Sequence, residues 1–371
     1  MSTITDAVSA ATALTGGATL CDDALLLSPG ECTLRLRSNS AALIDDLRRY
    51  FAHVVAPSGD KEPELDLVAI ESSPPDPGVE FIDWKREPGK TGRKDAYHDL
   101  EDGRLVWKVR TGMVFLQSET HRIAAGPCLK YDNQVINFIN AQYMNWLQHR
   151  DWLICHASGL VVRGSTLGIA GFSGGGKSTL MLRLLDHDQV SYLTNDRLFI
   201  RPNANGVDAI GIPKLPRVNP GTIVHNPKLH GLISREERDT LLALPRGELW
   251  DLEDKYDVDV AQVYGPGQIT PQAPLSAFLV LNWHRDLNEP PRLERVDPNT
   301  RRDLLGAIMK SPGPFYQYPD GSFRRDTTPL DEQAYLRMLG NVPVYEILGG
   351  VDFEAIVADC LAFAETGTRE R

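Results

Sequence analysis

The sequence has no long hydrophobic segment, since nowhere do about 18 apolar residues follow one another. Residues 1–20 contain no basic residue and no continuous apolar run, and the first basic residue is Arg35. A secretory signal peptide needs a basic N-terminal region and a continuous apolar run. We therefore expect neither a membrane-spanning helix nor a secretory signal.

The sequence has few cysteines, and they lie far apart from one another. The chain has five cysteines, an odd number, and no C-x-x-C pair. Such a pattern is typical of reduced thiols in the cytoplasm and predicts no cysteine metal site. We expect a cytoplasmic protein.

Positive charge is also in deficit. The chain of 371 residues has 39 Lys and Arg against 50 Asp and Glu, a formal net charge of −11. The average electrostatic field of a chain with this negative charge repels polymers of phosphate and anionic surfaces. This disfavours nucleic acid or an anionic membrane as a partner. A local cationic pocket for a single nucleotide is compatible with this balance. Length and a hydrophobic content of 42% predict two domains.

The pattern of residues 1–125 predicts an α+β region of unknown role. Apolar spacing favours a helix over residues 41–52 and a buried strand over 64–71, and Pro and Gly make 72–92 a loop. Alternating stretches in 95–125 predict antiparallel strands. A helix over 131–150 follows, and we place the domain boundary near residues 126–150.

The remainder predicts an α/β core. Strand patterns cover 153–162, 167–170, 190–194, 198–200, 275–281 and 342–348, and helix patterns cover 177–185 and 352–364. A strand, a Gly-rich turn, a helix and a further strand follow one another from residue 167, which is typical of a nucleotide-binding core with helices on a sheet.

Residues 171–178 read GFSGGGKS and match the phosphate-binding pattern G-x-x-x-x-G-K-[ST]. Glycines allow successive backbone N–H groups to turn toward an anion, and the following helix directs its positive end there. Lys177 would reach the β- and γ-phosphates, and Ser178 would offer a hydroxyl to Mg²⁺. The predicted nucleotide-binding residues are Gly171, Ser173, Gly174, Gly175, Gly176, Lys177, Ser178 and Thr179. The alternative is a Gly-rich hairpin without a ligand.

Three further residues, His156, Asn195 and Asp196, flank this motif. A hairpin at residues 163–165 would fold the strand that carries His156 back beside the motif's strand, and Asn195 and Asp196 end the next strand. Carboxylates at such strand ends face Mg²⁺ or an attacking hydroxyl in P-loop enzymes. From the residues alone, His156 is either structural or functional, and Asp196 is the stronger functional candidate.

The spacing of His156, the 171–178 motif and the pair Asn195-Asp196 resembles the catalytic domain of HPr kinase/phosphorylase, and in particular the HPr-kinase-related kinase B group. The resemblance covers roughly residues 150–290 and implies a P-loop core with a mixed sheet, shared with phosphoenolpyruvate carboxykinase. We expect this core to belong to a catalytic domain over residues 126–371. It also implies homo-oligomers.

Carried over position by position, the resemblance gives catalytic roles to three residues. Asp196 becomes the general base, His156 the active-site histidine and Lys177 the cation on the phosphates. Ser178, Asp196 and Asn195 become the Mg²⁺ ligands.

The chain departs from the family pattern at two points. The first acid of the family's acidic pair is Asn195, and the family's later Glu ligand has no counterpart in residues 211–222. Lys214, Arg217 and, more weakly, Asn219 lie there instead, as binders of phosphate or of an acidic substrate, or on a solvated loop.

Other clusters have plain interpretations. Six carboxylates in residues 248–259 are expected to form a solvated face or lid, with a replacement metal ligand as the alternative. Ser234 resembles a helix cap. We expect Trp146 and Trp152 to pack in the core, Cys155 to point away from His156, and the pairs Arg301-Arg302 and Arg324-Arg325 to be solvated.

The expected function is an ATP- and Mg²⁺-dependent kinase whose acceptor is a hydroxyl, foremost a serine of a small partner protein. The alternatives are a small-molecule hydroxyl kinase, a nucleotide-binding regulatory module without transfer, and simple ATP hydrolysis. No carboxykinase constellation is present, and phosphorylase activity stays open.

Overall fold

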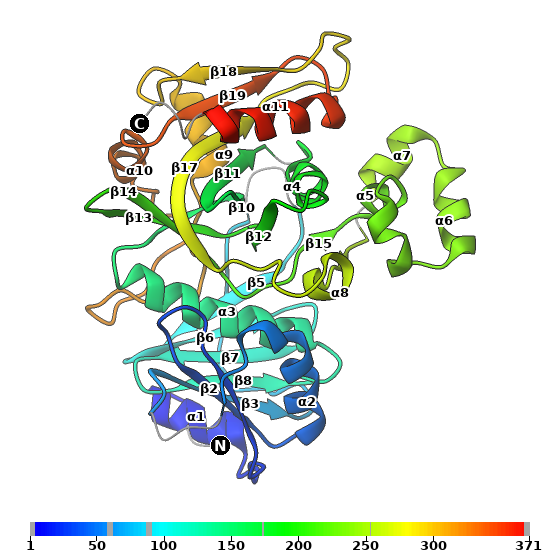
Figure 1. Cartoon of the computed structure of the whole chain (residues 1–371). Helices are drawn as coiled ribbons and strands as arrows, with labels where there is room; N and C mark the ends of the chain where they lie inside the picture. Colours follow the sequence, from blue (N-terminus) through cyan, green and yellow to red (C-terminus); the bar gives the residue numbers. More distant parts are fainter. Residues whose placement is uncertain (1–3, 58–61, 87–90, 173, 253, 367–371) are drawn as a thin grey trace. The chain divides into compact units, whose positions relative to one another are not determined.

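The computed structural model describes residues 4–57, 62–86, 91–172, 174–252 and 254–366. The chain divides into two compact units (Figure 1): one is Met1–Asp151 with Ser311–Pro329, and the other is Trp152–Lys310 with Leu330–Arg371. The division falls after the helix expected at 131–150, not before it. That helix belongs to the first unit because its side chains pack on that unit's sheet, and Asn145 donates to the carbonyl of Phe315 at 2.9 Å.

A mixed eight-stranded sheet forms the centre of the first unit, in the order β1-β2-β3-β8-β7-β6-β5-β4. Strands β2, β3 and β8 run parallel, and the other neighbours are antiparallel. The antiparallel strands predicted in 95–125 are thereby confirmed. The strands are β1 (Ala24–Leu27), β2 (Leu34–Ser38), β3 (Leu65–Glu71), β4 (Ile82–Asp83), β5 (Asp95–Asp99), β6 (Gly103–Lys108), β7 (Met113–Ser118) and β8 (Arg122–Gly126).

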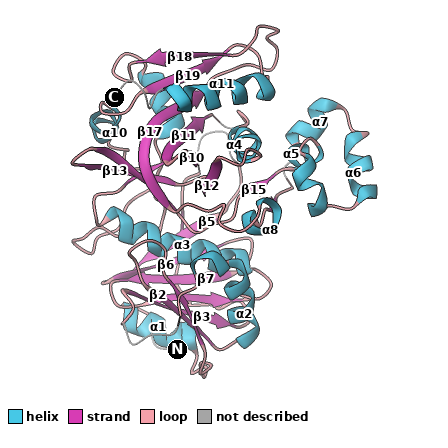
Figure 2. Ribbon diagram, in the orientation of Figure 1, coloured by secondary structure: helices cyan, strands magenta, loops and turns pink. Residues whose placement is uncertain are grey.

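Helices cover both faces of this sheet (Figure 2). Val114 and Leu116 share a buried cluster with α1 (Ala7–Thr15), a helix that the sequence analysis did not predict. Phe115, between them on β7, contacts Phe138 of α3 (Asp132–Gln148) at a ring distance of 5.0 Å. Alternation along β7 thus gives each helix its own face. The remaining helices are α2 (Ala41–Tyr50) and η1 (Ala52–Val54).

The second unit contains a nine-stranded mixed sheet, so the predicted mixed α/β fold class is confirmed at this level. Its path is β12-β10-β11-β17-β14-β13-β9, and β19 joins β17 to β18. The long curved β17 is parallel to β11 and β19, while its first residues pair with β14 (Figure 1). The strands are β9 (Leu153–Cys155), β10 (Ala157–Val162), β11 (Ser165–Gly171), β12 (Val190–Thr194), β13 (Leu198–Asn203), β14 (Gly206–Gly211), β17 (Gln272–Leu281), β18 (Arg292–Val296) and β19 (Val344–Leu348).

The predicted single strand over residues 153–162 is in fact two. β9 pairs with β13, whereas β10 pairs with β11 and β12. His156 lies between the two strands, at the point where the chain changes partner. At the break the backbone N–H of His156 donates to the carbonyl of Ile308 at 2.7 Å, outside both ladders.

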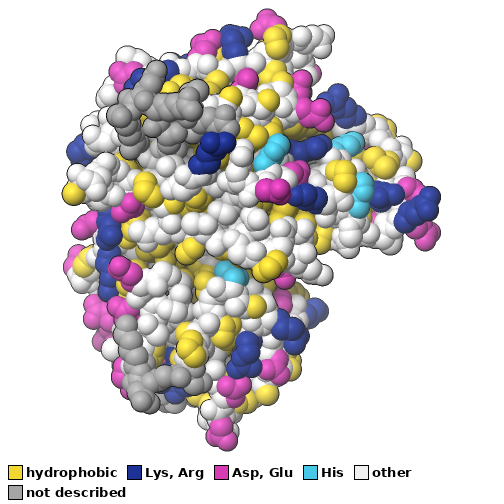
Figure 3. Space-filling view, viewed as in Figure 1, with side chains coloured by type: hydrophobic (Ala, Val, Ile, Leu, Met, Phe, Trp, Pro, Cys, Tyr) yellow, Lys and Arg dark blue, Asp and Glu magenta, His cyan; other side chains and the backbone are white. Residues whose placement is uncertain are grey.

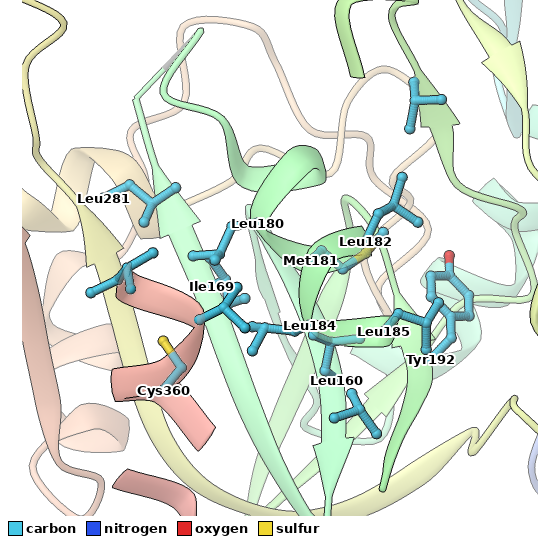
Figure 4. Close-up of a cluster of buried hydrophobic side chains, with 14 of the residues drawn as sticks. Leu160, Ile169, Leu180, Met181, Leu182, Leu184, Leu185, Tyr192, Leu281 and Cys360 are labelled. Carbon is cyan, nitrogen blue, oxygen red and sulfur yellow. The ribbon is translucent and has the colours of Figure 1, made fainter. Parts of the chain in front are cut away.

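Helix α4 (Lys177–Leu185) packs on one face of this sheet (Figure 4), where Leu180 and Leu184 meet Leu160, Ile169 and Cys360 of neighbouring elements. Cys360 belongs to α11 (Phe353–Thr366). The opposite face is covered by η3 (Arg302–Leu304), α9 (Leu305–Ile308) and α10 (Glu332–Leu339).

Residues 217–264 form a projecting segment beside α4 (Figure 1). It consists of β15 (Arg217–Val218), α5 (Pro220–Val224), η2 (Pro227–Leu232), α6 (Arg235–Leu242), α7 (Arg246–Asp251), β16 (Tyr256–Asp257) and α8 (Val260–Tyr264). Ser234 caps α6 as predicted, because its hydroxyl accepts from the N–H of Glu237. Across the described part of the chain, every helix is too short or too polar to cross a bilayer.

Candidate functional site

The loop between β11 and α4 has the strand–turn–helix form that the glycine motif requires. Gly174 and Gly176 have positive φ angles of +76° and +87°, and the N–H of Gly175 donates to the carbonyl of Phe172 at 3.0 Å. Gly176 ends the loop in the left-handed conformation, and α4 begins at Lys177. Ser173, a predicted binding residue, lies outside the described residues.

Close packing adds a second reason for glycine in this loop. A Cβ on Gly176 would lie 2.8 Å from the ring of Phe353, and a Cβ on Gly171 would lie 2.9 Å from Leu281 Cβ. Trp283 Nε1 donates to the carbonyl of Gly175 at 2.9 Å, and its ring meets Phe353 edge to face. Two aromatic side chains, Trp283 and Phe353, therefore pack against the loop.

The three residues after the glycines have defined partners. Lys177 Nζ donates to the carbonyl of Gly171 at 2.8 Å, so the side chain folds back over the loop. Ser178 Oγ donates to Asn195 Oδ1 at 3.0 Å. Thr179 Oγ1 lies 2.8 Å from the hydroxyl oxygen of Thr222, which ties this predicted binding residue to the projecting segment.

His156 and Asp196 come together from separate strand ends. His156 Nε2 lies 3.3 Å from Asp196 Oδ1, and Arg197 binds Asp196 Oδ2 through its own guanidinium. The carbonyl of the preceding residue, Asn195, accepts from Ser158 Oγ at 2.5 Å. Asn195 thus connects Ser178 to the strand that follows His156.

The electrostatic surroundings keep this carboxylate ionised. Burial raises the pKa of Asp196, but Arg197, His156 and Lys310 outweigh it, and the net pKa lies well below the usual range. The hydrogen bond with Asp196 raises the pKa of His156. Burial and the charges of Lys177 and Lys310 lower this pKa by a larger amount, so the net pKa of His156 lies below its usual value. Neutral His156 beside ionised Asp196 is the expected state at neutral pH.

Several cations surround Asp196. Burial lowers the pKa of Lys177, partly offset by Asp196. Burial also lowers the pKa of Lys214 to about 8, again against the attraction of Asp196. Together with Lys310 and Arg197 these side chains form a local excess of positive charge in an acidic chain. Such an excess beside a glycine turn suits a bound polyphosphate.

The loop residues singled out in the sequence have different surroundings. The negative charge of Asp196 acts on Lys214 and raises its pKa against the effect of burial. Arg217 instead pairs with Asp257 at 3.1 Å and donates to the carbonyl of Lys255. Asn219 precedes α5, and its Oδ1 is among the buried atoms of the described residues that have no hydrogen-bond partner. Only Lys214 of the three therefore joins the cluster around Asp196.

The described carboxylates of the stretch 248–259 are exposed, as expected of a solvated face, and three of them have partners. Asp251 pairs with Arg285, Asp257 with Arg217, and Asp259 caps α8 by accepting from Gln262. Figure 3 shows basic side chains among the acidic ones on the projecting segment. Glu253 lies outside the described residues, and within those described no three His, Cys, Asp or Glu side chains are placed to hold a metal ion together.

Of the two basic pairs expected to be solvated, Arg302 and Arg325 are exposed, whereas Arg301 is half-buried and Arg324 is buried. Arg301 binds Glu346, which is 1% exposed, and Arg324 is buried while donating to the carbonyls of Thr328 and Pro329. The carboxylate and the carbonyls replace the lost water. The burial predicted for Trp146 and Trp152 is confirmed. Cys155 is buried, and burial raises the pKa of its thiol, which disfavours the reactive thiolate.

Sequence reasoning missed Lys310, Trp283 and Arg285. None belongs to a motif, and each reaches the loop or Asp196 only because the sheet brings distant segments together. The aromatic residue at the end of the apolar strand 275–281 was the one local signal, since a large side chain there falls beside the strand that leads into the loop.

No known protein-family profile matches the sequence, and a search of curated proteins also found no match. Among solved structures, the HPr(Ser) kinase/phosphatase from Coxiella burnetii is similar. The match covers 59% of this chain and 99% of that chain, at 13% identity and a TM-score of 0.30. The relation to that family is a distant structural one.

Proposed function

We propose that this chain is an ATP-dependent phosphotransferase that moves the γ-phosphoryl group to a hydroxyl acceptor. One observation carries the proposal: His156 Nε2 and Asp196 Oδ1 meet at 3.3 Å in a cluster of cations that includes Lys177, the first residue after the glycine loop. A phosphate cradle, a base and charge-stabilising groups are the parts that phosphoryl transfer needs.

In the proposed reaction the loop N–H groups and Lys177 hold the phosphates. Asp196 accepts the proton of the acceptor hydroxyl as the new O–P bond forms and the bond to the leaving phosphate oxygen breaks. Its low pKa keeps it ready as a base at neutral pH. Neutral His156 orients the carboxylate through its contact with Oδ1.

The residues present fit a magnesium ion that enters with the nucleotide. Ser178 Oγ and Asn195 Oδ1 are oxygen donors 3.0 Å apart, and the Asp196 carboxylate follows directly in the chain. Mg²⁺ takes oxygen ligands and is held by one or two carboxylates together with phosphate oxygens and water. It would neutralise charge on the β- and γ-phosphates when bound.

The acceptor class that we propose is a serine of a small protein, with a small-molecule hydroxyl as its variant. The purified chain is incubated with γ-labelled ATP, Mg²⁺ and host extract, beside Lys177→Ala and Asp196→Ala. Label in the protein fraction supports a protein acceptor, and label in the soluble filtrate supports a small one. Equal transfer by all three proteins would refute the proposal.

A specific observation favours a second function, a nucleotide-binding module without transfer. Both oxygens of Asp196 have partners, in His156 and Arg197, and the neighbouring acid is replaced by Asn195. In that case Lys177→Ala abolishes ATP binding, while Asp196→Ala changes no measurable activity and no acceptor becomes labelled.

A further inference from the structure

Arg285 reaches the glycine loop from the chain segment after β17. Trp283 Nε1 donates to the carbonyl of Gly175, and Arg285 Nη2 lies 3.5 Å from where a Cβ on Gly174 would be. Trp283 is buried, and the N–H of His284 donates to the carbonyl of Gly349 at 2.9 Å. The buried Trp283 side chain and the backbone bond of the exposed His284 therefore place Arg285 beside the loop.

The other partners of Arg285 lie at the end of α7. Its guanidinium carbon is 4.0 Å from the ring centre of Trp250, and Nη1 is 3.5 Å from Asp251 Oδ1. The Arg285 side chain is 46% exposed and that of Asp251 is 77% exposed. An ion pair this exposed is weak because water screens it.

A phosphate group would compete well for the same guanidinium. Arginine donates two parallel N–H bonds to phosphate oxygens, and such charge-assisted pairs are about twice as strong as neutral hydrogen bonds. Lys177 is the first residue of α4, whereas Arg285 lies beside Gly174, earlier in the loop. The cations Lys177 and Arg285 are therefore placed at different parts of the same turn.

We propose that Arg285 binds the terminal phosphate of the nucleoside triphosphate and gives up Asp251 when it does so. The proposal rests on the proposed nucleotide site. Release of Asp251 frees the end of α7, so the projecting segment 217–264 responds to the terminal phosphate. Arg285 would then report whether a triphosphate or a diphosphate occupies the loop.

Nucleotide affinity tests the first half. The full chain is titrated with Mg²⁺–ATP and with Mg²⁺–ADP as wild type, Arg285→Ala, Arg285→Lys and Asp251→Asn. Arg285→Ala is expected to weaken ATP binding about tenfold and ADP binding by less than about threefold, with Arg285→Lys in between. Asp251→Asn should bind ATP at least as tightly as wild type, since it removes the competitor.

Arg292→Ala is the matched control. Arg292 is a half-exposed arginine on β18 that pairs with Glu294 of the same strand and with Glu289 of the loop before it. It should bind both nucleotides as wild type does. Thermal unfolding of each variant establishes that it is folded.

Hydrogen exchange at residues 246–251 tests the second half. In wild type ATP is expected to speed exchange there and ADP is not, whereas Arg285→Ala is expected to exchange fast with or without ATP. Wild-type ATP affinity in Arg285→Ala overturns the inference, and an equal loss for ATP and ADP overturns the assignment to the terminal phosphate. Unchanged exchange on adding ATP overturns the coupling to α7.

The two proposals fail in different ways. If wild type binds ATP, Lys177→Ala does not, and Arg285→Ala equals wild type, then only the role of Arg285 is refuted. If wild type binds neither nucleotide, the proposed function falls and the role of Arg285 falls with it.

Discussion

His156 Nε2 lies 3.3 Å from Asp196 Oδ1, and this contact joins the break between β9 and β10 to the end of β12. β10 pairs with β12 as far as Gly159 and Thr194, and the two residues lie just beyond this end of the ladder. This pairing brings the two residues together, and the backbone N–H of His156 also donates to the carbonyl of Ile308. The contact is the geometric basis of the proposed chemistry.

Replacing the carboxylate tests that chemistry directly. Asp196→Asn keeps the shape of the side chain but cannot take a proton, so phosphoryl transfer should fall by about 10²- to 10⁴-fold while ATP affinity changes little. His156→Gln should lower transfer less, because it removes only the orienting contact. Single-turnover transfer and nucleotide titration measure the two quantities. Unchanged transfer in Asp196→Asn would contradict the assignment of the base.

Lys214 predicts a pH dependence of nucleotide binding. Its pKa of about 8 means that the free protein loses this charge as the pH rises through 8. A bound polyphosphate favours the charged form, so ATP affinity should fall above pH 8, by up to about tenfold per pH unit. Below pH 7 the dependence on this group disappears because Lys214 is already charged.

Lys214→Arg is the control for that profile, since a guanidinium stays charged over the whole range. Its ATP affinity should stay level from pH 7 to pH 9.5, and that of Lys214→Met should be weak and equally level. If all three proteins show the same decline above pH 8, another group is responsible.

Gly176 and Gly267 separate backbone strain from crowding. Both have nearly the same φ, +87° and +83°, but a Cβ on Gly176 would meet Phe353 at 2.8 Å, whereas one on Gly267 meets nothing within 4 Å. Gly267→Ala should cost about 1 kcal/mol of unfolding free energy from backbone strain alone. Gly176→Ala should cost about 1–3 kcal/mol more, because the Cβ overpacks the aromatic support.

Urea unfolding compares the two glycine variants. The double variant Gly176→Ala, Phe353→Leu should recover part of the loss by removing the crowding atoms. Equal destabilisation by both single variants would mean that Phe353 moves aside without cost.

Arg104 predicts where the first unit is vulnerable. Its side chain is fully buried, binds Asp99 at 2.6 Å, donates to the carbonyls of Pro314 and Arg324, and stacks on Tyr97. Arg104→Met should destabilise this unit by about 3 kcal/mol, because the carboxylate and carbonyls lose a buried cation. Limited proteolysis should then cut within residues 311–329.

Arg93→Met serves as the comparison, since Arg93 pairs with Asp83 on the surface of the same unit, with both side chains about half exposed. Its loss should cost less than about 1 kcal/mol and leave the segment resistant. Equal sensitivity of the two variants would contradict the role given to Arg104.

Most regular elements follow from local pattern, and the glycine motif is the plainest case. The helix at 177–185 and the strand at 190–194 have the predicted bounds, because burial on one face sets the spacing of their apolar residues. α1 was not predicted, since its small residues Ala7, Ala10 and Ala11 give little contrast between its faces. The short helices of the projecting segment lack enough turns to show a period.

The site was predictable only in part, for a physical reason. Lys177, Ser178 and Asp196 stand in or near the motif, so their positions follow from local geometry. Lys310 and Arg285 arrive through long-range sheet pairing, and no periodicity encodes which strand will lie next to which. Arg324 was misassigned because burial of a charge depends on carbonyls that become available only after folding.

The interleaving of the two units limits how this protein can be divided or recombined. A cut after Asp151 separates Arg104 from the carbonyls of Pro314 and Arg324, which lie in the returning segment 311–329. A fragment that begins at Trp152 carries that segment without Arg104, which binds two of its carbonyls. Exchange of the first unit between related chains therefore needs three crossover points, and a single insertion or truncation site cannot do it.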